Sequence, residues 1–95
     1  MEMDISDIVE EIKQAYDYAY KNFSISTQLI CSNPNASEEE IERLLDLLLG
    51  YCEDDRILDL YKKVCKTFYS KYPNMIAEHI LMYKDMFKDM YEHSN

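Results

Sequence analysis

The stretch SEEEIERLLDLLLG, residues 37–50, decides the fold that this sequence predicts. Ser37 and Glu40 form the pattern of a capping box, in which each side chain accepts a hydrogen bond from the other residue's backbone amide. Five leucines and Ile41 follow, so the helix is apolar round most of its circumference and is expected at the centre of the protein. Gly50, the only glycine, comes directly after the leucines, where glycine commonly ends a helix.

A longer amphipathic helix is predicted upstream, with Asp4 able to cap its start. Its series of apolar and small side chains at helical spacing is Ile5, Ile8, Ile12, Ala15, Ala19, Phe23, Ser26 and Ile30. Residues 22–27 have weaker helix propensity, so a bend or an early end there is an alternative to one continuous helix. Pro34, with asparagine on both sides, predicts a loop between this helix and the central one.

Two further helices are predicted downstream. Glu53, Asp54 and Asp55 suit the positive end of a helix dipole and begin the third helix. Pro73 ends it and begins the fourth. The third helix has the apolar series Ile57, Tyr61, Val64, Phe68 and Tyr72. The fourth has two adjoining stripes, Ile76, Ile80, Tyr83, Phe87 and Tyr91, and Met75, His79, Met82, Met86 and Met90.

These elements predict an all-α fold, a small bundle of about four helices, mostly up-and-down, in which residues 1–95 form a single domain. One glycine and two prolines are too few for the turns of a sandwich or barrel. A hydrophobic content of 47% is too high for a disordered chain.

The formal net charge of −9 disfavours direct binding to nucleic acid or to anionic membranes. No apolar run is long enough to cross a membrane, and the acidic N-terminus does not resemble a signal peptide. Cys31, Cys52 and Cys65 are odd in number and far apart, which is typical of reduced thiols. We therefore expect a cytoplasmic protein.

No pattern of catalytic residues, cofactor ligands or metal ligands is recognised. The carboxylates at the start of the third helix are explained by its dipole, and no histidine stands at ligand spacing from them. His79 has no histidine or cysteine one turn away, so we interpret it as a partly buried structural residue. The sequence thus predicts no enzyme, no cofactor and no metal.

The acidic side chains admit two interpretations, a solvated face or a docking surface for a basic protein partner. The tyrosines near position 18 point in different directions, so at least one should be exposed, and the width of the fourth helix's apolar arc suggests a contact surface. The candidate partner-binding residues are Glu38, Glu39, Glu42, Asp46, Glu53, Asp54, Asp55, Asp59, Tyr18, Met86 and Met90.

The leading hypothesis is a non-enzymatic acidic protein-binding module, most concretely an inhibitor, immunity or antitoxin-like protein that occludes a basic partner. If that partner holds nucleic acid, the carboxylates could imitate phosphates. The alternative is a self-associating structural or adaptor subunit that uses the fourth helix as a homodimer seam.

Overall fold

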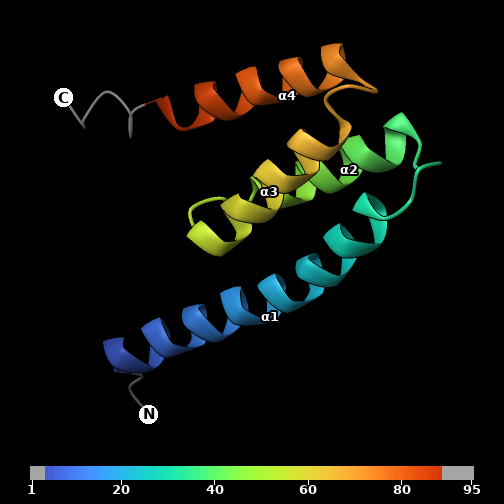
Figure 1. Ribbon diagram of the computed structural model, residues 1–95. Helices are drawn as coiled ribbons and strands as arrows, with labels where there is room; N and C mark the ends of the chain where they lie inside the picture. The colour runs from blue at the N-terminus through green and yellow to red at the C-terminus, as the bar shows by residue number, and fades with distance from the viewer. Residues whose placement is uncertain (1–3, 89–95) are drawn as a thin grey trace.

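The computed structural model describes residues 4–88, which form four α-helices and contain no strand. In chain order the helices are α1 (Ile5–Cys31), α2 (Glu38–Leu49), α3 (Asp55–Phe68) and α4 (Pro73–Met86). Successive helices run in alternating directions, with α2 and α3 between α1 and α4 (Figure 1). The predicted all-α, mostly up-and-down bundle is confirmed.

The helix ends follow the local signals in the sequence. Both hydrogen bonds of the capping box at Ser37 are present, each 3.2 Å long. Asp54 caps α3 by accepting a hydrogen bond from the backbone amide of Arg56 at 2.8 Å. Gly50 does follow α2, but its φ of −65° is helical, so no left-handed cap forms. The alternative of an early end to the first helix is wrong, because α1 continues through residues 22–27 to Cys31.

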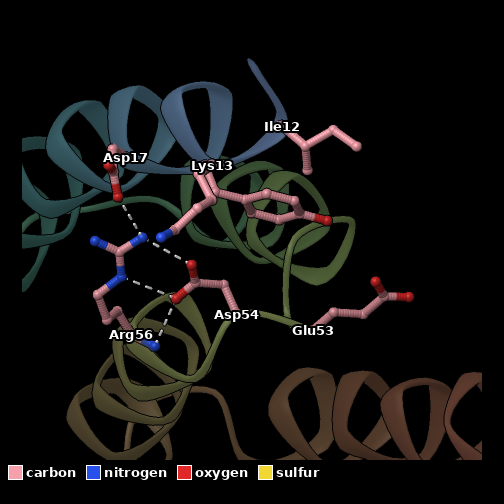
Figure 2. A pocket seen from close by; sticks show the side chains of 7 residues that line it. Ile12, Lys13, Asp17, Glu53, Asp54 and Arg56 are labelled. Carbon is pink, nitrogen blue, oxygen red and sulfur yellow. Dashed lines mark hydrogen bonds and ion pairs between the residues drawn. The ribbon is translucent and has the colours of Figure 1, made fainter. Parts of the chain in front are cut away.

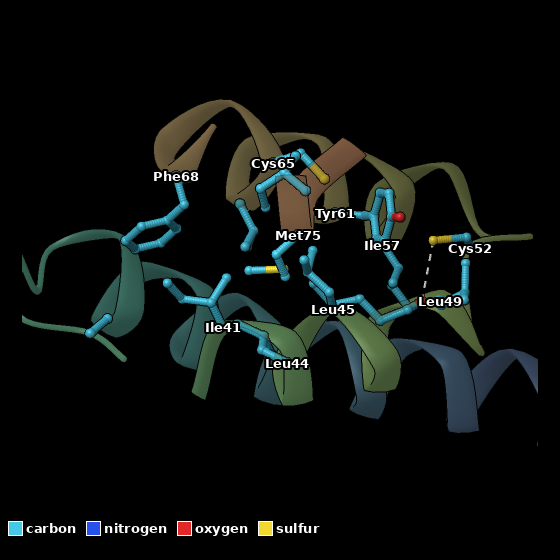
Figure 3. Close-up of a cluster of buried hydrophobic side chains, with 14 residues drawn as sticks. Ile41, Leu44, Leu45, Leu49, Cys52, Ile57, Tyr61, Cys65, Phe68 and Met75 are labelled. Atoms are coloured by element: carbon cyan, nitrogen blue, oxygen red, sulfur yellow. Dashed lines mark hydrogen bonds between the residues drawn. The ribbon is translucent and has the colours of Figure 1, made fainter. Parts of the chain in front are cut away.

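The hydrophobic core lies between α2, α3 and the start of α4 (Figure 3). The buried apolar side chains are Ala36, Ile41, Leu44, Leu45, Leu48, Leu49, Cys52, Ile57, Tyr61, Val64, Cys65, Phe68, Met75 and Ile76. None of them comes from α1, which covers this core with partly buried side chains such as Phe23 and Ile30. The core side chains of α2, α3 and the start of α4 are therefore more deeply buried than the apolar side chains of α1.

The molecule is elongated, with principal extents of 52 × 35 × 17 Å and a Cα radius of gyration of 15.5 Å. A compact domain of this length would have a radius of gyration of about 12 Å. Much of the difference comes from α1, whose 27 residues span about 40 Å, whereas the 14 residues of α3 span about 20 Å. Every residue from 5 to 15 is exposed, so this half of α1 projects beyond the core (Figure 1).

The two stripes predicted on α4 have different surroundings. Met75, Ile76 and His79, near the start of the helix, are buried. Met82 and Met86, toward its end, are exposed. The methionine stripe is therefore core at one end and surface at the other, and Met90 lies outside the described residues.

Candidate protein-binding surface

The projecting half of α1 presents an apolar stripe made of Ile5, Ile8, Val9 and Ile12. Its spacing of three, four and seven residues places the four side chains on one helix face. Their exposed fractions lie between 44% for Ile8 and 76% for Ile5. Large aliphatic side chains gathered on one face in this way are typical of contact surfaces. We call these four residues the α1 stripe.

A cleft with a volume of about 330 Å³ adjoins the α1 stripe (Figure 2). It lies between α1 and the start of α3. Its lining combines the apolar side chain of Ile12 and the ring of Tyr16 with several charged groups. These charged residues are Lys13, Asp17, Glu53, Asp54 and Arg56.

Arg56 holds the two walls of this cleft together. Its guanidinium forms ion pairs with Asp17 of α1 at 2.9 Å and with Asp54 at 2.8 Å (Figure 2). It also lies 4.9 Å from the centre of the Tyr20 ring. Hydrogen bonds from Arg56 lower the pKa of the Asp54 carboxyl, and both carboxylates raise the pKa of the guanidinium. Asp54, predicted to contact a partner, thus has a structural partner of its own.

The other carboxylates predicted at the start of α3 remain on the surface. Glu53, Asp55 and Asp59 are all exposed, and none forms an ion pair with another residue between 4 and 88. Only Glu53 of these three lines the cleft, where its side chain points away from Arg56 (Figure 2). An unpaired carboxylate beside apolar side chains can receive a cationic group from a partner.

The acidic residues of α2 form a separate group at the other end of the molecule, because α2 and α3 run in opposite directions (Figure 1). Glu38, Glu39 and Glu42 are exposed. Glu38 and Glu42 line a depression of about 310 Å³ together with Glu78 of α4. The predicted acidic residues therefore form two surfaces.

Asp46 takes part in a contact that the sequence did not predict. Its Oδ1 lies 2.7 Å from Nε2 of His79, which is only 3% exposed. The other ring nitrogen, Nδ1, lies 2.7 Å from the hydroxyl of Tyr61. That hydroxyl is also 3.1 Å from the His79 carbonyl oxygen, to which it can donate. This chain of hydrogen bonds joins α2, α3 and α4.

The order of groups in this contact, from the Tyr61 hydroxyl through the His79 ring to the Asp46 carboxylate, resembles a proton relay. Tyr61, however, is buried. Burial also raises the pKa of the Tyr61 phenol above its usual value. A protonated hydroxyl inside the core stabilises the packing of the helices that its hydrogen bonds join. His79 is thus more deeply buried than predicted, and its role in the structure is to connect helices.

The cysteines show no sign of activation. Burial raises the pKa values of Cys52 and Cys65 to about 11, so both stay in the less reactive thiol form near neutral pH. Cys31 is partly buried, and all three thiols are free. Within residues 4–88, no three His, Cys, Asp or Glu side chains gather closely enough to hold a metal ion.

The remaining predicted contact residues lie far from one another. Tyr18 is 72% exposed on α1, which agrees with the expectation that one neighbouring tyrosine faces solvent. Met86 is 59% exposed near the end of α4. Since α1 and α4 do not touch within the described residues, these two side chains cannot belong to one compact patch. Val9 and the rest of the α1 stripe were not predicted as contact residues, although their helical spacing was visible in the sequence.

No protein family model matches this sequence, and comparisons with curated proteins and with solved structures find no significant match. Between residues 4 and 88, no helix has both the length and the apolar content needed to cross a membrane.

Proposed function

We propose that this protein is a non-enzymatic binding module that recognises a basic protein partner through the α1 stripe and the adjoining cleft. The observation that carries the proposal is the exposure of Ile5, Ile8, Val9 and Ile12 on a helix that extends past its own core. Their burial against a partner would supply the apolar part of the binding energy.

The charge around this surface favours a basic partner. Residues 4–12 contain Asp4, Asp7, Glu10 and Glu11 and no basic residue. Glu53, which forms no ion pair among residues 4–88, adds a carboxylate at the cleft. A negative field of this kind speeds association with a positively charged protein and disfavours acidic competitors.

The most specific form of this proposal is an inhibitor, immunity or antitoxin-like protein that covers the functional surface of its partner. The three free cysteines are compatible with a reducing cytoplasmic setting. Where the partner normally holds nucleic acid, the carboxylates of residues 4–12 would occupy positions that phosphates take.

The proposal is tested by capture from the native cell extract followed by a binding measurement on the captured protein. A double variant with Ile8→Gln and Ile12→Gln removes apolar surface from the α1 stripe. Glutamine has a good helix propensity, so α1 should stay helical. Ile25→Gln with Leu29→Gln is the matched control, because both side chains are also exposed on α1 but lie outside the α1 stripe.

We expect the first pair to weaken binding at least tenfold and the control pair to leave the affinity nearly unchanged. Raising the salt concentration should weaken binding of the wild type, since charge steers the encounter. Equal affinity for all three proteins, or an affinity that salt does not change, contradicts the proposal.

A second candidate function is supported by a different observation. Leu81, Met82 and Met86 leave an exposed apolar surface on α4, which suits a seam between two copies of the chain. Replacing Met86 and Met90 by glutamate would then convert a dimer into a folded monomer, as measured by sedimentation equilibrium. A monomeric wild type removes this candidate.

A further inference from the structure

The groove between α3 and α4 differs from the rest of the surface in its charge. It has a volume of about 250 Å³ and an almost wholly apolar floor that includes Leu58, Cys65 and Ile80. Lysines stand on both sides, Lys62 and Lys66 on α3 and Lys84 on α4. We call this the lysine groove.

The lysines of this groove are not neutralised within the described protein. Among residues 4–88, none of the three ammonium groups forms an ion pair. Asp59 on α3 and Asp85 on α4 are the acidic residues nearest in sequence. A positive apolar groove in a chain with a net charge of −9 indicates an anionic, amphipathic occupant.

The α1 stripe has the complementary chemistry. Its apolar residues Ile5 to Ile12 span about 10 Å, and Leu58 to Lys66 along the groove span about 12 Å, at 1.5 Å per residue. At 100° per residue, Asp4 and Glu11 fall along one edge of the α1 stripe, whereas Lys13 follows on the opposite edge. The acidic edge can therefore face Lys62 and Lys66 while the isoleucines enter the groove.

The two surfaces cannot meet within one molecule. α1 and α4 do not touch among residues 4–88, and α2 and α3 lie between them (Figure 1). The projecting half of α1 lies on the opposite side of α3 from α4 (Figure 1). Only a second copy can bring the two together.

We propose that the α1 stripe of one molecule docks in the lysine groove of a second copy of this chain. The contact is heterologous, so the same two surfaces are used once in each molecule and assembly proceeds head to tail. Such a series either closes into a ring or continues as an open chain. The inference goes beyond the proposed function, because the lysine groove takes no part in binding a basic partner.

This arrangement also covers the surface that the proposed function needs. While the α1 stripe lies in another copy's groove, it cannot contact a basic partner. Partner binding and self-association are then competing reactions, and dilution favours the free binding surface.

The test is sedimentation velocity of the full chain over a range of concentrations, at low and at high salt. Lys62→Glu with Lys66→Glu reverses the charge of the groove, and Asp4→Lys with Glu11→Lys reverses the acidic edge of α1. Each pair has a matched control with the same change in net charge elsewhere. These controls are Lys21→Glu with Lys63→Glu, and Asp7→Lys with Glu10→Lys on the back of α1.

We expect the wild type to form oligomers that high salt dissociates. Each test pair should raise the dissociation constant at least tenfold, whereas each control pair should change it less than threefold. An equimolar mixture of the two test variants should associate again, because each supplies the charge that the other has lost. Circular dichroism checks that every variant remains helical.

A wild type that stays monomeric at every concentration overturns the proposal. So does association that survives both test pairs, or that control pairs weaken as much as test pairs, since the contact then lies elsewhere or depends only on net charge. The outcome is separate from that of the proposed function, because the Lys62 and Lys66 variant keeps the whole surface offered to a basic partner.

Discussion

The two halves of α1 share one sequence pattern but have different surroundings. In the second half, the ring of Phe23 lies 5.3 Å from that of Tyr51. At the junction, the Tyr16 ring packs edge-on against Tyr51 at 5.9 Å. Residues 5–15 follow the same apolar periodicity, and every one of them is exposed. Because α3 is only about half as long as α1, no helix among residues 4–88 covers the first half.

This difference shows what helical periodicity does and does not specify. Helical periodicity predicts which side of a helix is apolar. It does not show whether the element that covers this side belongs to the same chain. In a helix twice as long as its neighbour, the uncovered half is a surface by geometry alone. Both proposals above start from the exposure of its apolar residues.

The largest expected effect comes from comparing the core with the projecting half. Leu45→Ala removes a fully buried side chain and should lower the free energy of unfolding by about 2 to 5 kcal/mol. Ile8→Ala, in the α1 stripe, should change it by less than about 0.5 kcal/mol. Urea unfolding followed by circular dichroism measures both.

The measurement is made at a concentration where the wild type is monomeric. A loss above about 2 kcal/mol for Ile8→Ala would mean that the α1 stripe is covered within the monomer. The contrast between the two halves of α1 would then be lost.

The next effect concerns the polar contact inside the packed region. His79→Leu removes the ring hydrogen bonds to Tyr61 and Asp46, and should cost about 1 to 3 kcal/mol. Asp46→Asn is the control, because an amide oxygen still accepts from Nε2 and the Asp46 side chain is 58% exposed. We expect it to cost less than half as much in urea unfolding. If the two variants lose the same free energy of unfolding, most of the stabilisation comes from the contact between His79 and Asp46.

Much of the fold was predictable because its signals are local. The capping box at Ser37, the proline at the first position of α4 and the carboxylates before α3 each act over a few residues. Such short-range signals fix where helices begin and end. The sequence therefore predicted four helices and most of their bounds. The predicted end of the third helix at Pro73 is wrong, because α3 ends at Phe68 and a turn joins it to α4.

The surfaces were harder to predict because they depend on contacts between distant residues. Tyr61 and His79 are 18 residues apart, and Asp46 and His79 are 33 apart, so no spacing rule joins them. The sequence pattern of the α1 stripe is the same as that of a helix face buried in a core. Only the shorter length of α3 shows that this face is uncovered. Glu53 and Asp54 look alike in sequence, and only the position of Arg56 separates a structural carboxylate from an unpaired one.

A smaller effect should appear at alkaline pH. Burial raises the pKa values of Cys52 and Cys65 from 9.0 to about 11 in the folded protein. The unfolded chain loses these protons first, so their contribution to stability is complete below pH 9 and is lost as the pH rises toward 11. We expect a decline of about 1 to 2 kcal/mol between pH 9 and 10.5.

Other groups titrate in the same range, so the measurement is a difference between proteins. Urea unfolding at several pH values should show a steeper decline for the wild type than for a Cys52→Ala and Cys65→Ala variant. Parallel curves for the two proteins would show that the buried thiols do not titrate differently on unfolding.

The smallest effect lies within the packed half of α1, at Thr27. Its residue is 1% exposed, and its hydroxyl has no hydrogen-bond partner among residues 4–88. An unsatisfied buried hydroxyl is unfavourable, so Thr27→Val should raise the free energy of unfolding by up to about 1 kcal/mol. Thr67→Val is the control, because the Thr67 hydroxyl donates to the Lys63 carbonyl at 2.8 Å on an exposed face. Thr67→Val should leave the free energy of unfolding unchanged or slightly lower. A Thr27→Val variant that is less stable than the wild type would contradict the prediction. It would show that the Thr27 hydroxyl has a hydrogen-bond partner in solution and that α1 packs more favourably at this position than an unsatisfied hydroxyl implies.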